Sequence, residues 1–301
     1  MRAIAAPASL KNVLSAVAAA DALAEGLRAG GAEAVVFPVA DGGDGTLDVL
    51  ARVLGGEWRE VDVSAPLGGK VSARWLLLPS DKVSQGRVGV VESAQALGFH
   101  TVPRLDPLRA SSRGLGELIL AAAREAETLL VCLGGTVTLD GGAGMREVLG
   151  ELPLPTRVAC DVRSPLLDAV YVFGRQKGAT EEQFDELAER LRGLPDVPGS
   201  GSAGALGGAF AALGAELVPG AELVLDELGF DPRGYDLVVT GEGAVDETTW
   251  AGKAPGEVVR RCREAGVRYE LFSARDDFSG DHTRAREDLV ELGERLARQF
   301  A

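Results

Sequence analysis

The sequence predicts an α/β protein with two domains, and three observations support this prediction. Short apolar runs that suit buried strands alternate with helical patterns along much of the chain, beginning with residues 3–54. Several of these runs end in a glycine-rich turn that leads into a helix. Residues 58–92 differ, because apolar and polar residues alternate there as in antiparallel strands. We therefore expect a parallel-sheet α/β domain with a second, mixed-sheet α/β domain inserted into it.

The first half of the chain predicts a parallel α/β unit followed by antiparallel strands. Asn12 or Ser15 can cap an alanine-rich helix that runs to about Ala29, where Gly30 ends it. The turn 66–69 separates two alternating segments and predicts a hairpin. Strands are expected at 3–7, 34–39, 60–64, 71–78 and 87–92. Besides the helix that ends near residue 29, helices are expected at 47–54 and at 111–126.

The second half predicts further strands and helices in alternation. The run Leu129–Leu133 suits a strand buried on both faces, and Thr180 can cap a helix with Gln183 in its first turn. The expected elements are strands at 129–133, 158–162, 235–240 and 267–273, an extended segment at 170–173, and helices at 181–192, 203–213, 257–266 and 284–299.

Charge and composition argue against several classes of function. The formal net charge of −14 disfavours a nucleic-acid or anionic-membrane surface, but it does not exclude a small anionic substrate. No segment approaches the roughly 20 apolar residues of a membrane span, and the apolar run at the N-terminus is too short for a signal peptide. Three scattered cysteines without CxxC spacing suggest reduced thiols. We therefore expect a cytoplasmic protein.

The stretch 129–145 contains the strongest binding signal. An apolar strand candidate is followed by five glycines, two threonines and one acid within residues 134–144, and then by a helical pattern. Glycines let backbone N–H groups approach a ligand, and a helix N-terminus favours an anion. No Lys-Ser or Lys-Thr pair closes the loop, so it is not a P-loop. The stretch predicts a phosphate or carboxylate site.

Acidic glycine turns recur after two other strand candidates. They carry Asp41 and Asp44 in one turn and Glu242 and Asp246 in the other, in addition to Asp140. In open parallel sheets ligands bind beyond the carboxyl ends of the strands, and Mg²⁺ takes one or two carboxylates plus phosphate oxygens. Three lysines lie in glycine, proline or polar motifs nearby, namely Lys11, Lys177 and Lys253. The pattern favours Mg-nucleotide chemistry, although loop Asp and Gly residues can also simply build turns.

Other chemistries have little support in the sequence. His100 and His282 lack metal-ligand spacing, and no nucleophile elbow is present. A formal GxGxxG at 199–204 has no strand before it, so a dinucleotide site is not expected there.

Seven motifs, taken in order, resemble the type I glycerate kinase family, whose members phosphorylate D-glycerate with ATP. The likeness runs through most of the chain. The motifs are Ala40–Thr46, Ser112–Leu118, Gly134–Met145, Ala159–Val162 with Pro165 and Leu166, Phe173–Ala179, Gly201–Gly208, and Asp236–Gly243 with Asp246 and Gly252–Pro255.

The resemblance implies a flavodoxin-like α/β domain that carries an inserted second α/β domain, with the site in the cleft between them. It divides this chain into a discontinuous first domain at 1–57, 110–150 and 233–301, and a second domain at 58–109 and 151–232. The implied reaction is ATP-dependent phosphorylation of D-glycerate, usually to 2-phosphoglycerate, with ATP and Mg²⁺ as cofactors. The expected partners are ATP and the hydroxy acid, without nucleic acid or membrane, and homodimerisation is left open.

The candidate site residues follow from these motifs. Asp161 and Asp246 are expected to serve as metal ligand or general base, with Asp41 and Asp140 supporting them. Three lysines are expected to bind phosphate or carboxylate oxygens of the ligands, namely Lys11, Lys177 and Lys253. Substrate or ATP binding is further assigned to Gly42, Gly43, Gly134, Gly135, Thr136, Gly141, Gly142, Gly241 and Glu242.

Two departures from the family pattern leave alternatives open. Ala8 stands where the family has Asp, and Leu139 stands where it usually has Asn. One alternative is a catalytically impaired paralogue that binds a small hydroxy acid or nucleotide without turnover. The other is a kinase for a related hydroxy acid.

Overall fold

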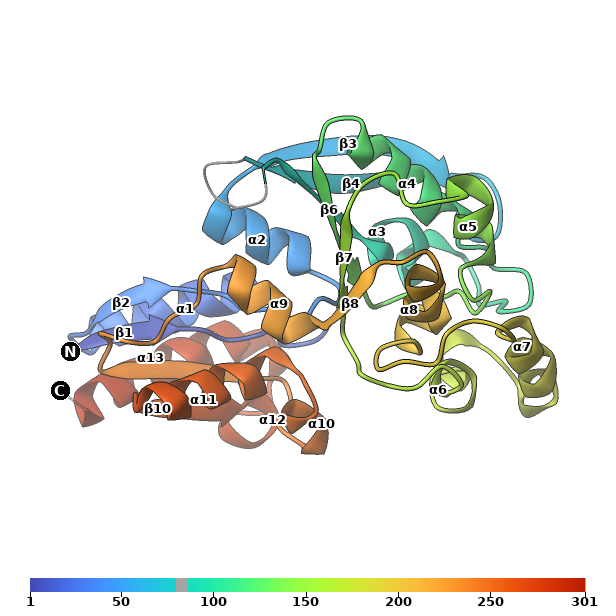
Figure 1. Cartoon of the computed structure of the whole chain (residues 1–301). Coiled ribbons are helices and arrows are strands. Elements are labelled where there is room, and N and C mark those ends of the chain that lie inside the picture. Colours follow the sequence, from blue (N-terminus) through green and yellow to red (C-terminus); the bar gives the residue numbers. More distant parts are fainter. Residues whose placement is uncertain (80–85, 301) are drawn as a thin grey trace. The chain divides into compact units, whose positions relative to one another are not determined.

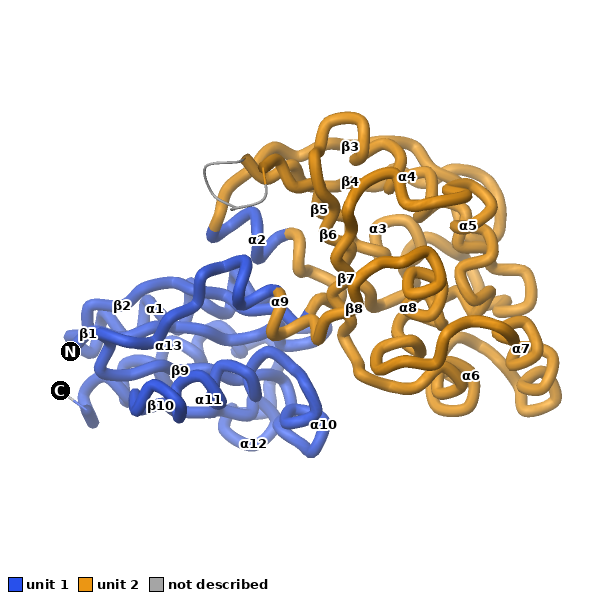
Figure 2. Tube along the Cα trace, viewed as in Figure 1, with its two compact units in different colours: residues 1–41, 48–53, 224–301 blue, residues 42–47, 54–223 orange. Residues whose placement is uncertain are grey.

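The computed structural model describes residues 1–79 and 86–300 and divides into two compact units (Figure 2). Unit 1 comprises residues 1–41, 48–53 and 224–301, and unit 2 comprises residues 42–47 and 54–223. Each unit contains a sheet with helices (Figure 1), so the predicted α/β class is confirmed. No helix among these residues has the length and apolarity needed to span a membrane.

Unit 1 is built on a parallel sheet of four strands with the order β10-β9-β1-β2, within the residues that the structure describes. Ser15 caps α1 by accepting a hydrogen bond from the Ala18 amide, as predicted. Figure 1 shows α1 beside α13, and leucines of both helices belong to the core of this unit. The strands are β1 (Arg2–Ala5), β2 (Glu33–Val36), β9 (Leu237–Glu242) and β10 (Tyr269–Ser273), and the helices are α1 (Ala16–Ala29), α10 (Glu247–Trp250), α11 (Ala254–Ala265), α12 (Ala274–Asp277) and α13 (Ala285–Gln299).

Unit 2 is built on a mixed sheet of six strands with the order β3-β4-β5-β6-β7-β8, over the described part of the chain. The strands β3 and β4 form the predicted antiparallel hairpin, whereas β5 to β8 run parallel to one another. Leucine and valine side chains of these strands form the main core with α4 and α8. The strands are β3 (Glu57–Ser64), β4 (Lys70–Leu78), β5 (Val88–Glu92), β6 (Thr128–Leu133), β7 (Thr156–Cys160) and β8 (Glu216–Pro219).

The helices of unit 2 follow its parallel strands. They are α3 (Ser93–Leu97), α4 (Arg113–Ala123), α5 (Ala143–Leu149), α6 (Asp168–Tyr171), α7 (Phe184–Arg190) and α8 (Ser202–Ala212). Thr180 and Gln183 form the predicted capping box, although the first turn after Thr180 is a 3₁₀ helix that precedes α7. Two helices, α2 (Thr46–Leu54) and α9 (Gly220–Glu227), contain residues of both units.

The structure corrects two expectations from the sequence. Residues 110–150 were assigned to the first domain, but β6 pairs with β5 and β7 in the six-stranded sheet, so this segment belongs to unit 2. The segment 170–173 was expected to be extended, but most of it lies in α6 and its C-cap, where Ala169 and Val170 are buried in a small apolar cluster. Both differences arise from contacts between residues far apart in the chain, which local patterns do not encode.

Candidate functional site

The predicted site residues fall into two groups, one in each unit. The sequence placed the acidic turns beyond the strand ends of a parallel sheet, but β6 and β9 lie in different sheets, so the turns that follow these two strands do not share one sheet edge. The unit 2 group contains Gly42, Gly43, Gly134, Gly135, Thr136, Asp140, Gly141, Gly142, Asp161 and Lys177, and the unit 1 group contains Lys11, Asp41, Gly241, Glu242, Asp246 and Lys253.

The unit 2 group begins at the carboxyl ends of the neighbouring strands β5, β6 and β7. Gly134 follows β6, and Asp161 follows β7 and donates its backbone N–H to the Leu133 carbonyl at 3.2 Å. A Cβ at position 134 would lie 2.7 Å from the Gly43 Cα and 2.8 Å from Asp161 Oδ2. Only glycine therefore allows the loop after β6 to approach both the 42–45 turn and the Asp161 carboxylate.

Glu92, the last residue of β5, holds the 42–47 segment and was not predicted as a site residue. Its side chain is completely buried, and its two carboxylate oxygens accept hydrogen bonds from the Gly45 amide (3.2 Å) and the Leu47 amide (3.1 Å). Burial raises the pKa of Glu92 to about 8, and the nearby Asp44 carboxylate contributes in the same direction. An acid at the end of an otherwise apolar strand was the sequence signal that could have identified it.

Ser93 fixes the backbone of Gly134. The buried Ser93 hydroxyl donates to the Gly134 carbonyl at 3.0 Å and accepts from the Gly134 amide at 3.1 Å. Both peptide groups of this glycine are thus held by one side chain. These two hydrogen bonds fix the start of the loop after β6, and a fixed backbone lowers the entropic cost of binding a ligand.

Asp140 organises the loop rather than presenting an open carboxylate. Its Oδ2 accepts from the Ser112 amide and hydroxyl, both at 2.8 Å, and from the Gly144 amide at 3.1 Å. Its Oδ1 accepts from the Gly142 amide at 3.1 Å. These four donors belong to the starts of α4 and α5, so Asp140 joins the two helices.

Leu139, which replaces the usual Asn of the resembled family, is completely buried in an apolar cluster. The cluster also contains Leu166, Val170 and Ala205. The Leu139 side chain is therefore accounted for by packing inside unit 2.

Lys177 is a buried lysine within the unit 2 group. The residue is only 4% exposed. Its Nζ donates to the Thr136 carbonyl and, at 3.0 Å, to the Thr136 hydroxyl. Burial lowers the pKa of Lys177 to about 8, and the negative charge of Asp161 partly opposes this shift. Thr136, Asp161 and Lys177, three residues predicted from separate motifs, are thus brought together.

A left-handed segment at the start of α8 supports this arrangement. Ala203, Gly204 and Ala205 have φ values of 52°, 76° and 68°, which cost energy for alanine. A Cβ at position 204 would lie 1.9 Å from the Thr138 carbonyl oxygen, so glycine is required there. The reversed backbone places the Ala203 carbonyl where it accepts a hydrogen bond from the Thr136 hydroxyl at 3.0 Å.

The unit 1 group is centred on Glu242 at the end of β9. Glu242 is 8% exposed, and its carboxylate accepts a hydrogen bond from the Thr249 hydroxyl at 2.7 Å. Lys253 forms an ion pair with the other oxygen at 3.2 Å and keeps about a third of its side chain exposed (32%). The carboxylate therefore positions both the start of α10 and the Lys253 ammonium.

Asp246 and Lys11 lie at exposed turns of unit 1. Asp246 caps α10, because its side chain accepts from the Thr248 amide at 2.8 Å and from the Thr248 hydroxyl. These hydrogen bonds, together with the charge of Lys253, lower the pKa of Asp246. A Cβ at Gly243 would lie 3.7 Å from the Lys11 amide, so the Lys11 turn adjoins the loop after β9.

Asp41 and Asp44 are the remaining acids of the predicted turns. Asp41, the last residue of the first segment of unit 1, is partly buried, and Asp44 is exposed in unit 2. Within residues 1–79 and 86–300 no group of three or more His, Cys, Asp or Glu side chains could hold a metal ion by itself. Mg²⁺ that is bound together with phosphate oxygens needs only one or two protein carboxylates, and the predicted ones are Asp161 in unit 2 and Asp246 in unit 1.

Comparisons with known proteins agree on one family. The model of the glycerate kinase family matches residues 3–154 and 152–286. Glycerate kinase of Halalkalibacterium halodurans is 35% identical, covering 87% of this chain and 82% of that protein. Glycerate 2-kinase of Escherichia coli is 37% identical, covering 85% and 80%. The crystal structure of putative glycerate kinase 2 from Salmonella typhimurium LT2 superposes with a TM-score of 0.80 at 30% identity, covering 99% and 98%.

Proposed function

The chain belongs to the glycerate kinase family, and we propose that it transfers the γ-phosphoryl group of ATP to a hydroxyl group of D-glycerate, forming 2-phosphoglycerate. The substrate hydroxyl oxygen bonds to the γ-phosphorus, and the bond from that phosphorus to the β,γ-bridging oxygen breaks. ADP leaves with the bonding electron pair, and the hydroxyl proton moves to a carboxylate.

One observation carries the proposal: a buried lysine lies among glycine loops at the carboxyl ends of parallel strands. In unit 2 the Lys177 ammonium donates to Thr136, and the nearby Asp161 carboxylate partly opposes the lowering of the lysine pKa by burial. An ammonium group in a site shielded from water stabilises the charge on a transferred phosphoryl group far more than an exposed one does. Lys177 and the Gly135 N–H group, beside the backbone of the Gly42–Gly43 turn, are therefore the proposed phosphoryl-binding groups.

Asp161 is the proposed proton acceptor or magnesium ligand of unit 2. Mg²⁺, when bound with ATP, would neutralise phosphate charge at this carboxylate. In unit 1 Asp246 is the second candidate for either role, and Lys11 and Lys253 are proposed to hold phosphate or carboxylate oxygens. Asp140 and Glu242 support these groups, because their oxygens are engaged by neighbouring donors.

The proposal includes ATP and the hydroxy acid as small-molecule partners, and a cytoplasmic location. Cys132, Cys160 and Cys262 are buried thiols outside any disulfide, which suits a reducing compartment. Homodimerisation stays a prediction that a sedimentation measurement can test.

A coupled assay of ADP release with ATP, Mg²⁺ and D-glycerate tests the activity. We expect glycerate-dependent ADP formation, and phosphorus NMR of the product is expected to show the 2-phosphate ester. Binding of a non-hydrolysable ATP analogue without any ADP above background would instead favour the impaired paralogue. Turnover with another hydroxy acid in a substrate panel, and not with D-glycerate, would favour the related kinase.

A further inference from the structure

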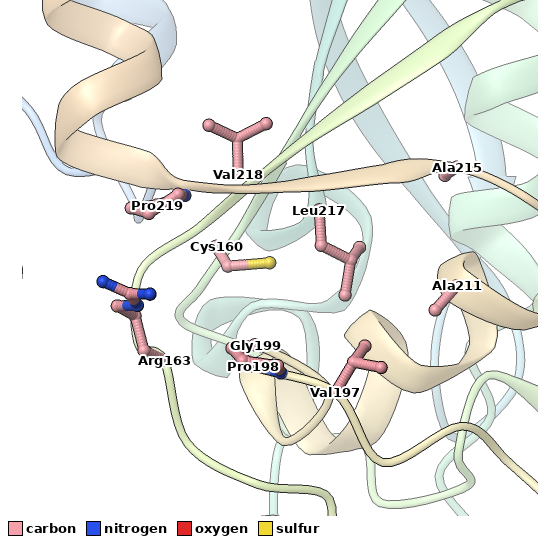
Figure 3. A pocket seen from close by; sticks show the side chains of 10 residues that line it. All are labelled: Cys160, Arg163, Val197, Pro198, Gly199, Ala211, Ala215, Leu217, Val218 and Pro219. Carbon is pink, nitrogen blue, oxygen red and sulfur yellow. The ribbon is translucent and has the colours of Figure 1, made fainter.

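A pocket of about 360 Å³ lies at the carboxyl ends of β7 and β8 in unit 2 (Figure 3). Cys160, the last residue of β7, and Leu217 of β8 direct their side chains into the space between β8 and the 197–199 loop. Ala211 of α8 closes another side. The volume falls within the range of about 300–1,000 Å³ that small-molecule sites occupy.

The walls of this pocket suit a flat, neutral ring. Most of the lining is aliphatic, including Val197, Pro198 and Leu217. Cys160 is 3% exposed, and a buried cysteine outside any disulfide behaves as a small apolar group.

Two residues that line the pocket are followed directly in the sequence by residues at the proposed phosphoryl-binding groups. Cys160 lines the pocket, and the next residue is Asp161. Pro219 lines it too, and a Cβ at Gly42 would lie 3.2 Å from the Cα of the following Gly220. Of the ten lining residues, all within the described part of the chain, Arg163 alone is charged, and its guanidinium can contact a phosphate.

We propose that this pocket is the subsite for the adenine ring of ATP, with Arg163 contacting the phosphate chain that leaves the pocket. The assignment rests on the proposed kinase function and adds the place where the nucleotide base binds. A ring in this pocket and phosphates at the Gly42–Gly43 and Gly134–Gly135 turns lie at neighbouring strand ends of one sheet, where ligands of α/β sheets bind.

Filling the pocket tests the assignment with a matched pair of variants on α8. Ala211 lines the pocket, whereas the neighbouring Ala212 is exposed and does not line it. We expect Ala211→Phe to raise the KM for ATP at least tenfold, with the KM for D-glycerate changed less than twofold. Ala212→Phe should change neither constant. An unchanged KM for ATP in a folded Ala211→Phe protein would overturn the subsite.

Enlarging the pocket gives a second test that does not depend on loss of activity. Leu217 and Leu213 are both partly buried against the main core of unit 2, but only Leu217 is among the residues that line the pocket. We expect Leu217→Ala to use N6-benzyl-ATP at least tenfold better, relative to ATP, than the wild type does. Leu213→Ala should keep the wild-type preference. Equal preference in both variants would place the base elsewhere.

The outcomes separate this inference from the proposed function. If glycerate-dependent ADP release is normal but neither variant of the lining residues alters nucleotide use, the kinase function stands and the subsite is wrong. If the wild type releases no ADP, calorimetry with the ATP analogue AMP-PNP decides the subsite. Weaker AMP-PNP binding by Ala211→Phe, and not by Ala212→Phe, would then support the subsite while the proposed reaction fails.

Discussion

The two groups of candidate residues differ most clearly in how they hold a lysine. In unit 2 Lys177 is 4% exposed, contacts the Thr136 oxygens, and has a lowered pKa. In unit 1 Lys253 forms an ion pair with Glu242 and keeps about a third of its side chain exposed (32%). A charge removed from water acts strongly on a nearby phosphoryl group, whereas an exposed and paired charge is screened. The comparison suggests that the unit 2 lysine contributes to the chemical step and the unit 1 lysine mainly to binding.

The largest expected effect comes from Lys177→Met. Removal of the buried ammonium should lower kcat about 10²- to 10³-fold, the range found when one preorganised charge-stabilising donor is lost. Thermal stability should fall, because the buried Thr136 carbonyl loses the ammonium donor and the Asp161 carboxylate loses a nearby positive charge. The exposed Lys70→Met is the control and should leave kcat unchanged. A normal kcat in Lys177→Met would remove the basis of the comparison.

Asp140→Ala should give the next largest effect, and it acts on stability. The change leaves the Ser112, Gly142 and Gly144 donors without their common acceptor, so we expect a loss of about 2–4 kcal/mol in the free energy of unfolding. Asp246→Ala in unit 1 removes an exposed helix cap and should cost only about 1 kcal/mol. Chemical denaturation of both variants checks the difference. Equal losses would show that the two acids are held alike.

Glu92 should make stability depend on pH in a direction opposite to that of most carboxylates. Its pKa is raised to about 8 in the folded protein, so between about pH 4.5 and 8 the folded state binds more protons than the unfolded state. The stabilisation is complete below about pH 4.5 and is lost as pH rises through about 8. Relative to Glu92→Gln, the wild type should therefore lose unfolding free energy by roughly 1 kcal/mol per pH unit over this range.

A control variant and a kinetic pH profile test whether Glu92 is a positioning residue. The exposed Glu216→Gln is the control, and its pH dependence of unfolding should match that of the wild type. Because Glu92 holds the Gly45 and Leu47 amides, the pH profile of kcat/KM for ATP should also change in Glu92→Gln. If stability alone responds and the kinetic profile is that of the wild type, Glu92 has only a structural role.

The smallest kinetic effect is expected for Lys253→Met. Loss of an exposed, paired ammonium should raise a substrate KM about tenfold or less and should leave kcat within a few-fold of the wild type. Steady-state kinetics with ATP and D-glycerate varied separately will show which substrate is affected. A drop in kcat as large as that of Lys177→Met would mean that exposure does not distinguish the two lysines.

The sequence by itself determined the local elements and the family. Helix caps at Ser15 and Thr180, the hairpin turn at 66–69 and the apolar period of the terminal helix depend on residues only a few positions apart, and the structure contains all of them. The seven motifs likewise identified the glycerate kinase family, because each is a short run whose residues can be compared directly. Thr136, Asp161 and Lys177 were chosen from separate motifs and do lie together in unit 2.

Only the tertiary structure decided which sheet each strand joins and which charges are buried. Glu92 was missed because its role depends on Gly45, 47 positions away, and Lys177 reaches Thr136 across 41 positions. The place of β6 between β5 and β7 likewise moved residues 110–150 to unit 2, and Leu139, which looked like a lost site residue, proved to be buried in a core. Strand neighbours and burial arise from long-range packing, so they set pKa values and site membership that no local pattern contains.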